Sequence, residues 1–300
     1  MRNRRNVRSW IVVQENLHIT RKEVIQMKKR EGLRSWMYII FMAVTLMGLN
    51  MLLSQVPAQA AVDCPASSST TDTDKDGFTD FQECNGITLA DGTSFPGKSS
   101  QAAITVRLDP DTRDLFVILA PATPSSFLPA NPLEFVSKPV SQGGLGLNVH
   151  VITATQAATD RTVCPNCTLP TGQTTKQKAV RVTESLDVSN PNLLGISKPG
   201  TPNGLDLATV YTQRIKNSFT SILGTTPSQD LIDLYIKHTI AHEIGHMVGP
   251  LAPTGSSSYG GYHYKSGTNV IMDQSVYYKG TTFYIGTTYT STDQTKTKLK

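Results

Sequence analysis

The feature that most constrains the fold of this chain is the segment His242-Glu243-Ile244-Gly245-His246. Residues four apart lie on one face of a helix, about one turn from each other, so the two imidazoles can point at one position in space. Such a pair supplies the first two ligands of a tetrahedral zinc site. Glu243 follows the first histidine, where its carboxylate can accept a proton from a zinc-activated water. The segment therefore predicts a zinc-binding helix and the chemistry of a hydrolase.

The residues around this segment predict the helix that carries it. Pro227 favours a helix start, and Ser228 is a candidate N-cap. An apolar-rich stretch of about 20 residues follows, and Gly249-Pro250 ends it. We therefore expect the two histidines on the last two turns of a long, mostly buried helix, which is a rigid support for metal ligands.

The third zinc ligand is not determined by the segment itself. Glu243 is the last glutamate in the chain, so the families that use glutamate as third ligand are excluded. His263 is the only later histidine, and the aspartates Asp273 and Asp293 are further candidates, with Asp273 favoured between the two aspartates. A site with two histidines also stays open. His238, one turn before the segment, is interpreted as a supporting polar group.

Two further features resemble the metzincin family of zinc peptidases. Gly249 stands three residues after His246, where the metzincin motif has a glycine that lets the chain turn back. Val-Ile-Met272 resembles the Met-turn, whose methionine lies beneath the metal. The histidine expected six residues after the second ligand is replaced by Ala252, so the resemblance implies an enlarged turn before His263. It covers roughly residues 238–273.

The resemblance implies an α/β (α+β) zincin-like fold with a twisted mixed sheet and a long active-site helix, to which residues 72–83 add a small N-terminal calcium loop. It implies a zinc endopeptidase, a monomer that acts on protein or peptide substrates, with Glu243 as general base. The implied zinc ligands are His242, His246 and His263, above Met272. Two other functions stay open: a non-catalytic, calcium-stabilised surface or adhesion module with a degenerate zincin fold, and a zinc hydrolase of a non-peptide amide.

A second metal-binding pattern occupies residues 72–83. It matches the twelve-position calcium loop of EF-hands, with Gly77 at the sixth position and a glutamate at the twelfth. The loop lacks a partner hand, which indicates a structural calcium site rather than a sensor; the alternative is a solvated acidic turn. It resembles the calcium repeats of secreted bacterial proteins and thrombospondin type 3 modules. The predicted ligands are Asp72, Asp74, Asp76, the backbone carbonyl of Phe78, Asp80 and Glu83.

The four cysteines fall into two local pairs, Cys64 with Cys84 and Cys164 with Cys167. An even number in an exported chain suggests disulfides, although the sequence allows three connectivities. We expect the local pairs. The segment Cys-Pro-Asn-Cys could instead bind metal or act in redox chemistry, but no second such segment accompanies it, so we interpret it as a structural loop.

Residues 1–60 are typical of an export leader. They hold ten of the 28 basic and three of the 23 acidic residues, followed by an apolar run and Ala58-Gln59-Ala60. We expect cleavage after Ala60 and secretion; the alternative is an uncleaved membrane anchor. The remaining 18 basic and 20 acidic residues give a net charge of −2 for residues 61–300, which argues against a nucleic-acid partner.

The rest of the chain predicts a calcium-loop segment at 61–100 and a peptidase domain at 101–300. β-Branched and apolar runs predict four strands, and the spacing at 205–223 is helical. His150, within the third strand, is interpreted as a packed side chain. Another strand is expected around 281–289, and the end of the tail is expected to fray. The four predicted strands lie at 102–108, 114–120, 144–153 and 178–185.

Overall fold

The structure is a computed structural model in which Val62–Lys300 forms one compact unit. The predicted leader lies outside the described residues. In the part of the chain that is described, no helix is long and apolar enough to cross a membrane. The described residues are 64–299, apart from 66, 101, 104–105, 124, 191, 199–206, 250–262, 265–268, 274–276 and 280–281.

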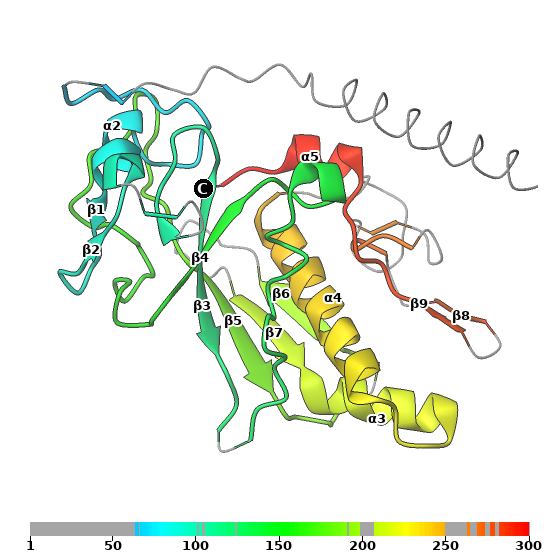
Figure 1. Cartoon of the computed structure of the whole chain (residues 1–300). Helices are drawn as coiled ribbons and strands as arrows, with labels where there is room; N and C mark the ends of the chain where they lie inside the picture. Colours follow the sequence, from blue (N-terminus) through cyan, green and yellow to red (C-terminus); the bar gives the residue numbers. More distant parts are fainter. Residues whose placement is uncertain are drawn as a thin grey trace, which may run out of the picture. The chain divides into compact units, whose positions relative to one another are not determined.

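A mixed sheet covered by one long helix forms the centre of the described chain (Figure 1). Its five strands lie in the order β4-β3-β5-β7-β6. The first four run parallel, and β6 pairs antiparallel with β7 at one edge. The expected mixed α/β fold with a mixed sheet is therefore confirmed. The strands are β3 (Asp114–Ala120), β4 (Asn148–Ile152), β5 (Val180–Ser185), β6 (Gly195–Lys198) and β7 (Leu207–Tyr211).

Three of the predicted strands, at 114–120, 144–153 and 178–185, correspond to β3, β4 and β5. The strand predicted at 102–108 is wrong, because its described residues, 102–103 and 106–108, belong to no strand. The Val106 N–H donates to the carbonyl of Ala103 at 2.9 Å, which closes a turn. An alternating apolar pattern is not sufficient for a strand, because a strand also needs a neighbouring strand with which to pair.

The helix predicted over 205–223 is also wrong in its first part. Residues 207–211 form β7, and α3 (Thr212–Leu223) begins only after it. Ala208 and Val210 are buried on one face of β7, while the residues between them are partly exposed. Pairing with β5 and β6 satisfies the β7 backbone on both sides, and this tertiary contact overrides the local helical spacing.

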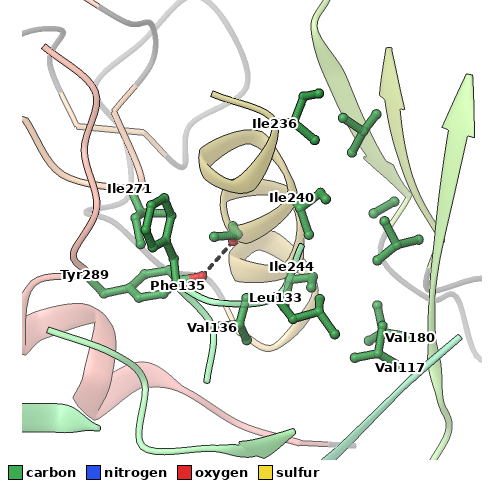
Figure 2. Packing of buried hydrophobic residues seen from close by; sticks show 14 of the residues in the cluster. Val117, Leu133, Phe135, Val136, Val180, Ile236, Ile240, Ile244, Ile271 and Tyr289 are labelled. Atoms are coloured by element: carbon green, nitrogen blue, oxygen red, sulfur yellow. Dashed lines mark hydrogen bonds between the residues drawn. The ribbon is translucent and has the colours of Figure 1, made fainter. Parts of the chain in front are cut away.

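Helix α4 (Gln229–Met247) carries the histidine segment, as predicted. Ser228 is its N-cap, with its hydroxyl accepting the N–H of Leu231 at 3.3 Å. Figure 2 shows Ile236, Ile240 and Ile244 turned toward the sheet. Each of these side chains is fully buried, and burying one contributes about 1.5–3 kcal/mol. This core fixes α4 against the sheet.

A second buried cluster lies on the other face of β3, because alternate residues of a strand point to opposite faces. Leu115 and Val117 belong to the cluster around α4. Phe116 and Ile118 belong to the second cluster, together with Phe78 from the acidic loop. The Phe78 and Phe116 rings meet edge to face with centroids 5.9 Å apart. The acidic loop is therefore packed into the same compact unit as the sheet.

The C-terminal tail does not fray in the described residues. It forms helix α5 (Ser291–Lys296), whose start is capped reciprocally by Thr290 and Asp293. Asp293 is completely buried, so the polar tail is anchored rather than solvated. The strand expected at 281–289 is shorter than predicted, being confined to β9 (Thr282–Tyr284), which pairs with β8 (Tyr277–Lys279). The remaining short elements are α2 (Asp80–Asn85), β1 (Ile87–Thr88), β2 (Ser94–Phe95), η1 (Lys98–Ser100) and η3 (Val140–Gln142).

Candidate metal centres

Three imidazoles converge at the C-terminal end of α4. The Nε2 atom of His246 lies 3.1 Å from that of His242 and 3.2 Å from that of His263, and the third Nε2–Nε2 distance is 3.1 Å. In a tetrahedral site with Zn–N bonds of 2.0–2.1 Å, ligand nitrogens lie about 3.3 Å apart. The three ring nitrogens therefore have the separation and the common focus of metal ligands.

The protonation of these rings also suits a metal. His242 Nδ1 lies 2.7 Å from the Ile271 carbonyl oxygen, which can only accept, so Nδ1 carries the proton and Nε2 keeps its lone pair. Burial and the neighbouring imidazoles lower the pKa of His242 well below its ordinary value. Burial, with the charge of His263, lowers the pKa of His246 to about 4. The rings are neutral at neutral pH, as metal binding requires.

The third member of this group is His263, the histidine that the sequence favoured. The backbone N–H of the next residue, Tyr264, donates to the Met272 carbonyl at 2.9 Å, which ties this short segment to the core. Asp273 lies outside the group and accepts the N–H of Asn269 at 2.7 Å. The structure thus brings together the histidines and leaves Asp273 with a backbone-capping contact.

The other residues considered near this site have supporting positions. His238 donates from Nδ1 to the Gly286 carbonyl at 2.8 Å, and its ring stacks on Tyr235 with centroids 5.7 Å apart. Met272 is completely buried in the core around α4. Asp293 caps α5 and also lies outside the histidine group. None of these three side chains joins the grouped ligand atoms among the described residues.

Glu243 lies on α4 against the edge strand β6. Only 6 % of its surface is exposed, and burial raises its pKa to about 7, opposed by a hydrogen bond from the Ser197 hydroxyl. The β6 backbone approaches so closely that a Cβ added at Gly195 would lie 2.5 Å from the Glu243 carboxylate. Glycine is therefore required where this strand passes the carboxylate. No sequence pattern marks Gly195 or Ser197, because their proximity to Glu243 depends on the formation of the sheet.

The second group of candidate ligands is the acidic loop. Its carboxylate oxygens lie within 4.8 Å of one another and come from Asp72, Asp74, Asp76 and Glu83. Glu83 is completely buried, and neither of its carboxylate oxygens has a hydrogen-bond partner. One oxygen of Asp74 is likewise buried without a partner. Unpaired buried carboxylate oxygens are costly, so this group fits a hard divalent cation.

The mutual repulsion of these carboxylates also favours a bound divalent cation. Burial and the neighbouring carboxylates raise the pKa of Asp74 to about 10 and raise those of Asp76 and Glu83 as well.

Asp80, a predicted ligand, lies outside the group. It accepts hydrogen bonds from the N–H and the hydroxyl of Thr73, at 2.8 and 2.9 Å. This local contact turns the Asp80 carboxylate toward the loop backbone.

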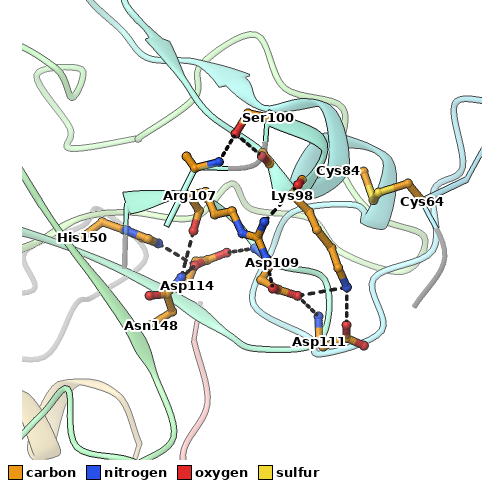
Figure 3. Close-up of polar contacts among 12 residues, drawn as sticks. Cys64, Cys84, Lys98, Ser100, Arg107, Asp109, Asp111, Asp114, Asn148 and His150 are labelled. Carbon is orange, nitrogen blue, oxygen red and sulfur yellow. Dashed lines mark hydrogen bonds and ion pairs between the residues drawn. A yellow bond between two sulfur atoms is a disulfide. The ribbon is translucent and has the colours of Figure 1, made fainter. Parts of the chain in front are cut away.

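The acidic loop is joined to the sheet by buried polar contacts that sequence reasoning missed. Asp76 accepts the N–H of Asp114, the first residue of β3, at 2.7 Å. The Asp114 side chain in turn contacts His150 Nε2 at 2.5 Å and accepts from Asn148 Nδ2 at 2.7 Å (Figure 3). His150 is therefore a packed, hydrogen-bonded side chain, as the sequence suggested. Gln173, which is 101 residues further along the chain, donates a hydrogen bond to Asp72 at 2.6 Å.

Both cysteine pairs are disulfides with the expected local connectivity. Cys64 is bonded to Cys84, which ends the acidic loop at α2 (Figure 3). Cys164 is bonded to Cys167, which closes a four-residue loop. As a disulfide, the second pair offers no thiolate for a metal ion, and its interpretation as a structural loop stays a prediction.

The chain was also compared with known proteins. It matches no protein-family model, no curated protein and no solved structure.

Proposed function

We propose that this chain is a secreted, zincin-like zinc endopeptidase, with zinc held by His242, His246 and His263. The observation that carries the proposal is the convergence of three histidine Nε2 atoms, two of them from the helix that also carries the buried carboxylate of Glu243. Bound zinc would supply a Lewis acid that polarises a peptide carbonyl and acidifies water. This combination supports hydrolysis over a purely structural zinc site, which needs no adjacent base.

Glu243 is the proposed general base. Its carboxylate accepts a proton from the attacking water and passes that proton to the amine that leaves. Burial raises the pKa of this carboxyl to about 7 in the metal-free chain, and the charge of a bound zinc ion would lower it, which favours the carboxylate form that a general base requires. Ser197 holds the carboxylate beside β6 through its hydroxyl.

The position of Glu243 supports a peptide as substrate. It lies against β6, the edge strand, which pairs only with β7 among the described residues. An extended polypeptide can add to such an edge through backbone hydrogen bonds. A peptide bond held there would lie one strand spacing from the backbone of Gly195, which packs against the Glu243 carboxylate.

The experiment that tests the endopeptidase is cleavage of casein and gelatin by residues 61–300, with zinc and after chelation. We expect cleavage that disappears with 1,10-phenanthroline and returns with added zinc. Stoichiometric zinc binding without cleavage of either protein would contradict the proposal. It would then favour a non-catalytic surface module or hydrolysis of a non-peptide amide, and cell-wall amides would separate these two.

We propose that Asp72, Asp74, Asp76 and Glu83 bind calcium as a structural ion. Calcium at 100 times its Kd stabilises a protein by about 2.7 kcal/mol. For a domain of this size we therefore expect Tm to rise by about 5–10 °C when calcium is added to metal-free protein. Thermal unfolding, followed by circular dichroism during a calcium titration, measures this.

Glu83→Gln is the informative variant, because it removes a charge at a buried position without changing shape. We expect most of the calcium-dependent rise in Tm to be lost. Asp91→Asn is the matched control, since Asp91 is exposed and lies outside the group. An equal calcium response in wild type and Glu83→Gln would contradict the site.

A further inference from the structure

We propose that the C-terminal segment 285–297 positions the third zinc ligand, with Tyr264 as the residue that transmits its support to His263. The inference rests on the proposed zinc site, but concerns residues that bind no metal themselves. Tyr264 and the residues of helix α5 are positioning residues in this proposal.

The first argument is the way in which Tyr264 is held. Its backbone N–H donates to the Met272 carbonyl at 2.9 Å. Its hydroxyl shares a hydrogen bond of 2.8 Å with the Thr290 hydroxyl and donates to Asp293 Oδ1 at 3.3 Å. The backbone and the hydroxyl of Tyr264 are thus both held by hydrogen bonds, and His263 is the residue immediately before it. The direction of the His263 ring depends on this anchor.

The second argument is that the same segment supports the helix that carries the other two ligands. The Tyr289 hydroxyl donates to the Ala241 carbonyl at 2.7 Å, one residue before His242 (Figure 2). The Thr288 carbonyl accepts the N–H of Ile271 at 2.8 Å. Ile271 is the residue whose carbonyl orients the His242 ring. The segment 285–297 therefore contacts both Tyr264, the neighbour of His263, and Ile271, whose carbonyl orients His242.

The third argument is that α5 is itself firmly anchored. Thr290 and Asp293 cap each other reciprocally, and Asp293 is completely buried. After the helix, the Lys298 N–H donates to the carbonyl of Val248, the residue that ends α4, at 2.5 Å. Arg113, just before β3, donates to the Thr297 carbonyl at 2.5 Å. A support fixed to both the metal helix and the sheet can hold a ligand in place.

Metal sites are sensitive to such supports. Removing an outer hydrogen-bonding partner of a ligand typically costs 10- to 100-fold in metal affinity, because the ligand must then be ordered on binding. Tyr264 acts through the backbone rather than through the ring of His263, so we expect the lower end of this range.

Tyr264→Phe tests the proposal because it removes only the hydroxyl. We expect zinc affinity, measured by competition with a fluorescent chelator, to fall by roughly 10-fold. In the cobalt-substituted protein, the visible absorption bands should change, since they report the ligand geometry. The unfolding temperature of the metal-free variant should change little, which separates positioning from general destabilisation. Tyr211→Phe is the matched control, because Tyr211 packs on Arg214, 3.7 Å from the ring centroid, away from the histidines.

Thr290→Val provides an independent second variant, and the double variant completes a cycle. Thr290→Val also removes the N-cap of α5, so the test is non-additivity: if the two hydroxyls act through one another, the double variant should lose less zinc affinity than the sum of the two single losses. Wild-type zinc affinity and an unchanged cobalt spectrum in Tyr264→Phe would overturn the positioning role while leaving the zinc site intact. A wild-type chain that binds no zinc would instead overturn the zinc site, and with it this inference.

Discussion

Replacing Glu243 by glutamine should lower kcat by roughly 10²- to 10⁴-fold, the range that a positioned general base supplies. The amide has nearly the shape of the carboxylate but cannot accept the proton. Because Glu243 does not belong to the group of three histidines, zinc content should stay close to one ion per chain. KM should also change little, since the residue is proposed to act on the water rather than to bind the substrate.

The measurement is the initial rate of casein cleavage, paired with zinc content by atomic absorption on the same sample. Glu134→Gln is the matched control. It makes the same change at a glutamate whose side chain is 40 % exposed and pairs with Lys237 at 2.7 Å. If Glu243→Gln retains wild-type turnover, Glu243 is not the base and the proposed mechanism fails.

Replacing His263 by alanine should have the second large effect, on metal binding itself. It removes one of the three converging nitrogens and leaves two, both on α4. We expect zinc affinity to fall by at least about 100-fold, beyond the 10- to 100-fold cost of losing an outer partner. Dialysis against a weak chelator followed by metal analysis should then show a zinc-free variant.

Asp273→Asn is the comparison that makes this result specific. Asp273 was the alternative ligand from the sequence, and the structure instead has it accepting the N–H of Asn269. We expect this variant to keep its zinc. Full zinc occupancy in His263→Ala, together with zinc loss in Asp273→Asn, would reverse the assignment of the third ligand.

Much of the fold could be predicted wherever a short stretch of sequence contains its own geometric rule. Strand β3 follows from an uninterrupted apolar run, and the N-cap of α4 from Ser228 at its start. Strand β7 could not be predicted in this way, since five residues fit a strand and a helix about equally well. Residues 207–211 form a strand because they pair with β5 on one side and β6 on the other.

In the candidate metal sites, too, local spacing could be predicted from the sequence, whereas contacts between distant residues could not. The twelve-residue spacing of the acidic loop correctly identified four carboxylates that lie together, but not the contact with Thr73 that turns Asp80 away. No periodicity marks helix α5, whose residues are polar. Its stability depends on the buried cap at Asp293 and on bonds to Val248 and Arg113.

What the sequence by itself determined is that His242 and His246 lie together on α4, because two histidines four residues apart share one face of any helix. The sequence left the third ligand open between His263 and Asp273. Only the tertiary structure groups His263, and not Asp273, with the two histidines of α4, and the bond from Tyr264 to Met272 ties this segment to the core. The physical reason is distance along the chain: spacing within one helix is fixed by backbone geometry, whereas a ligand 17 residues further on depends on everything that packs between.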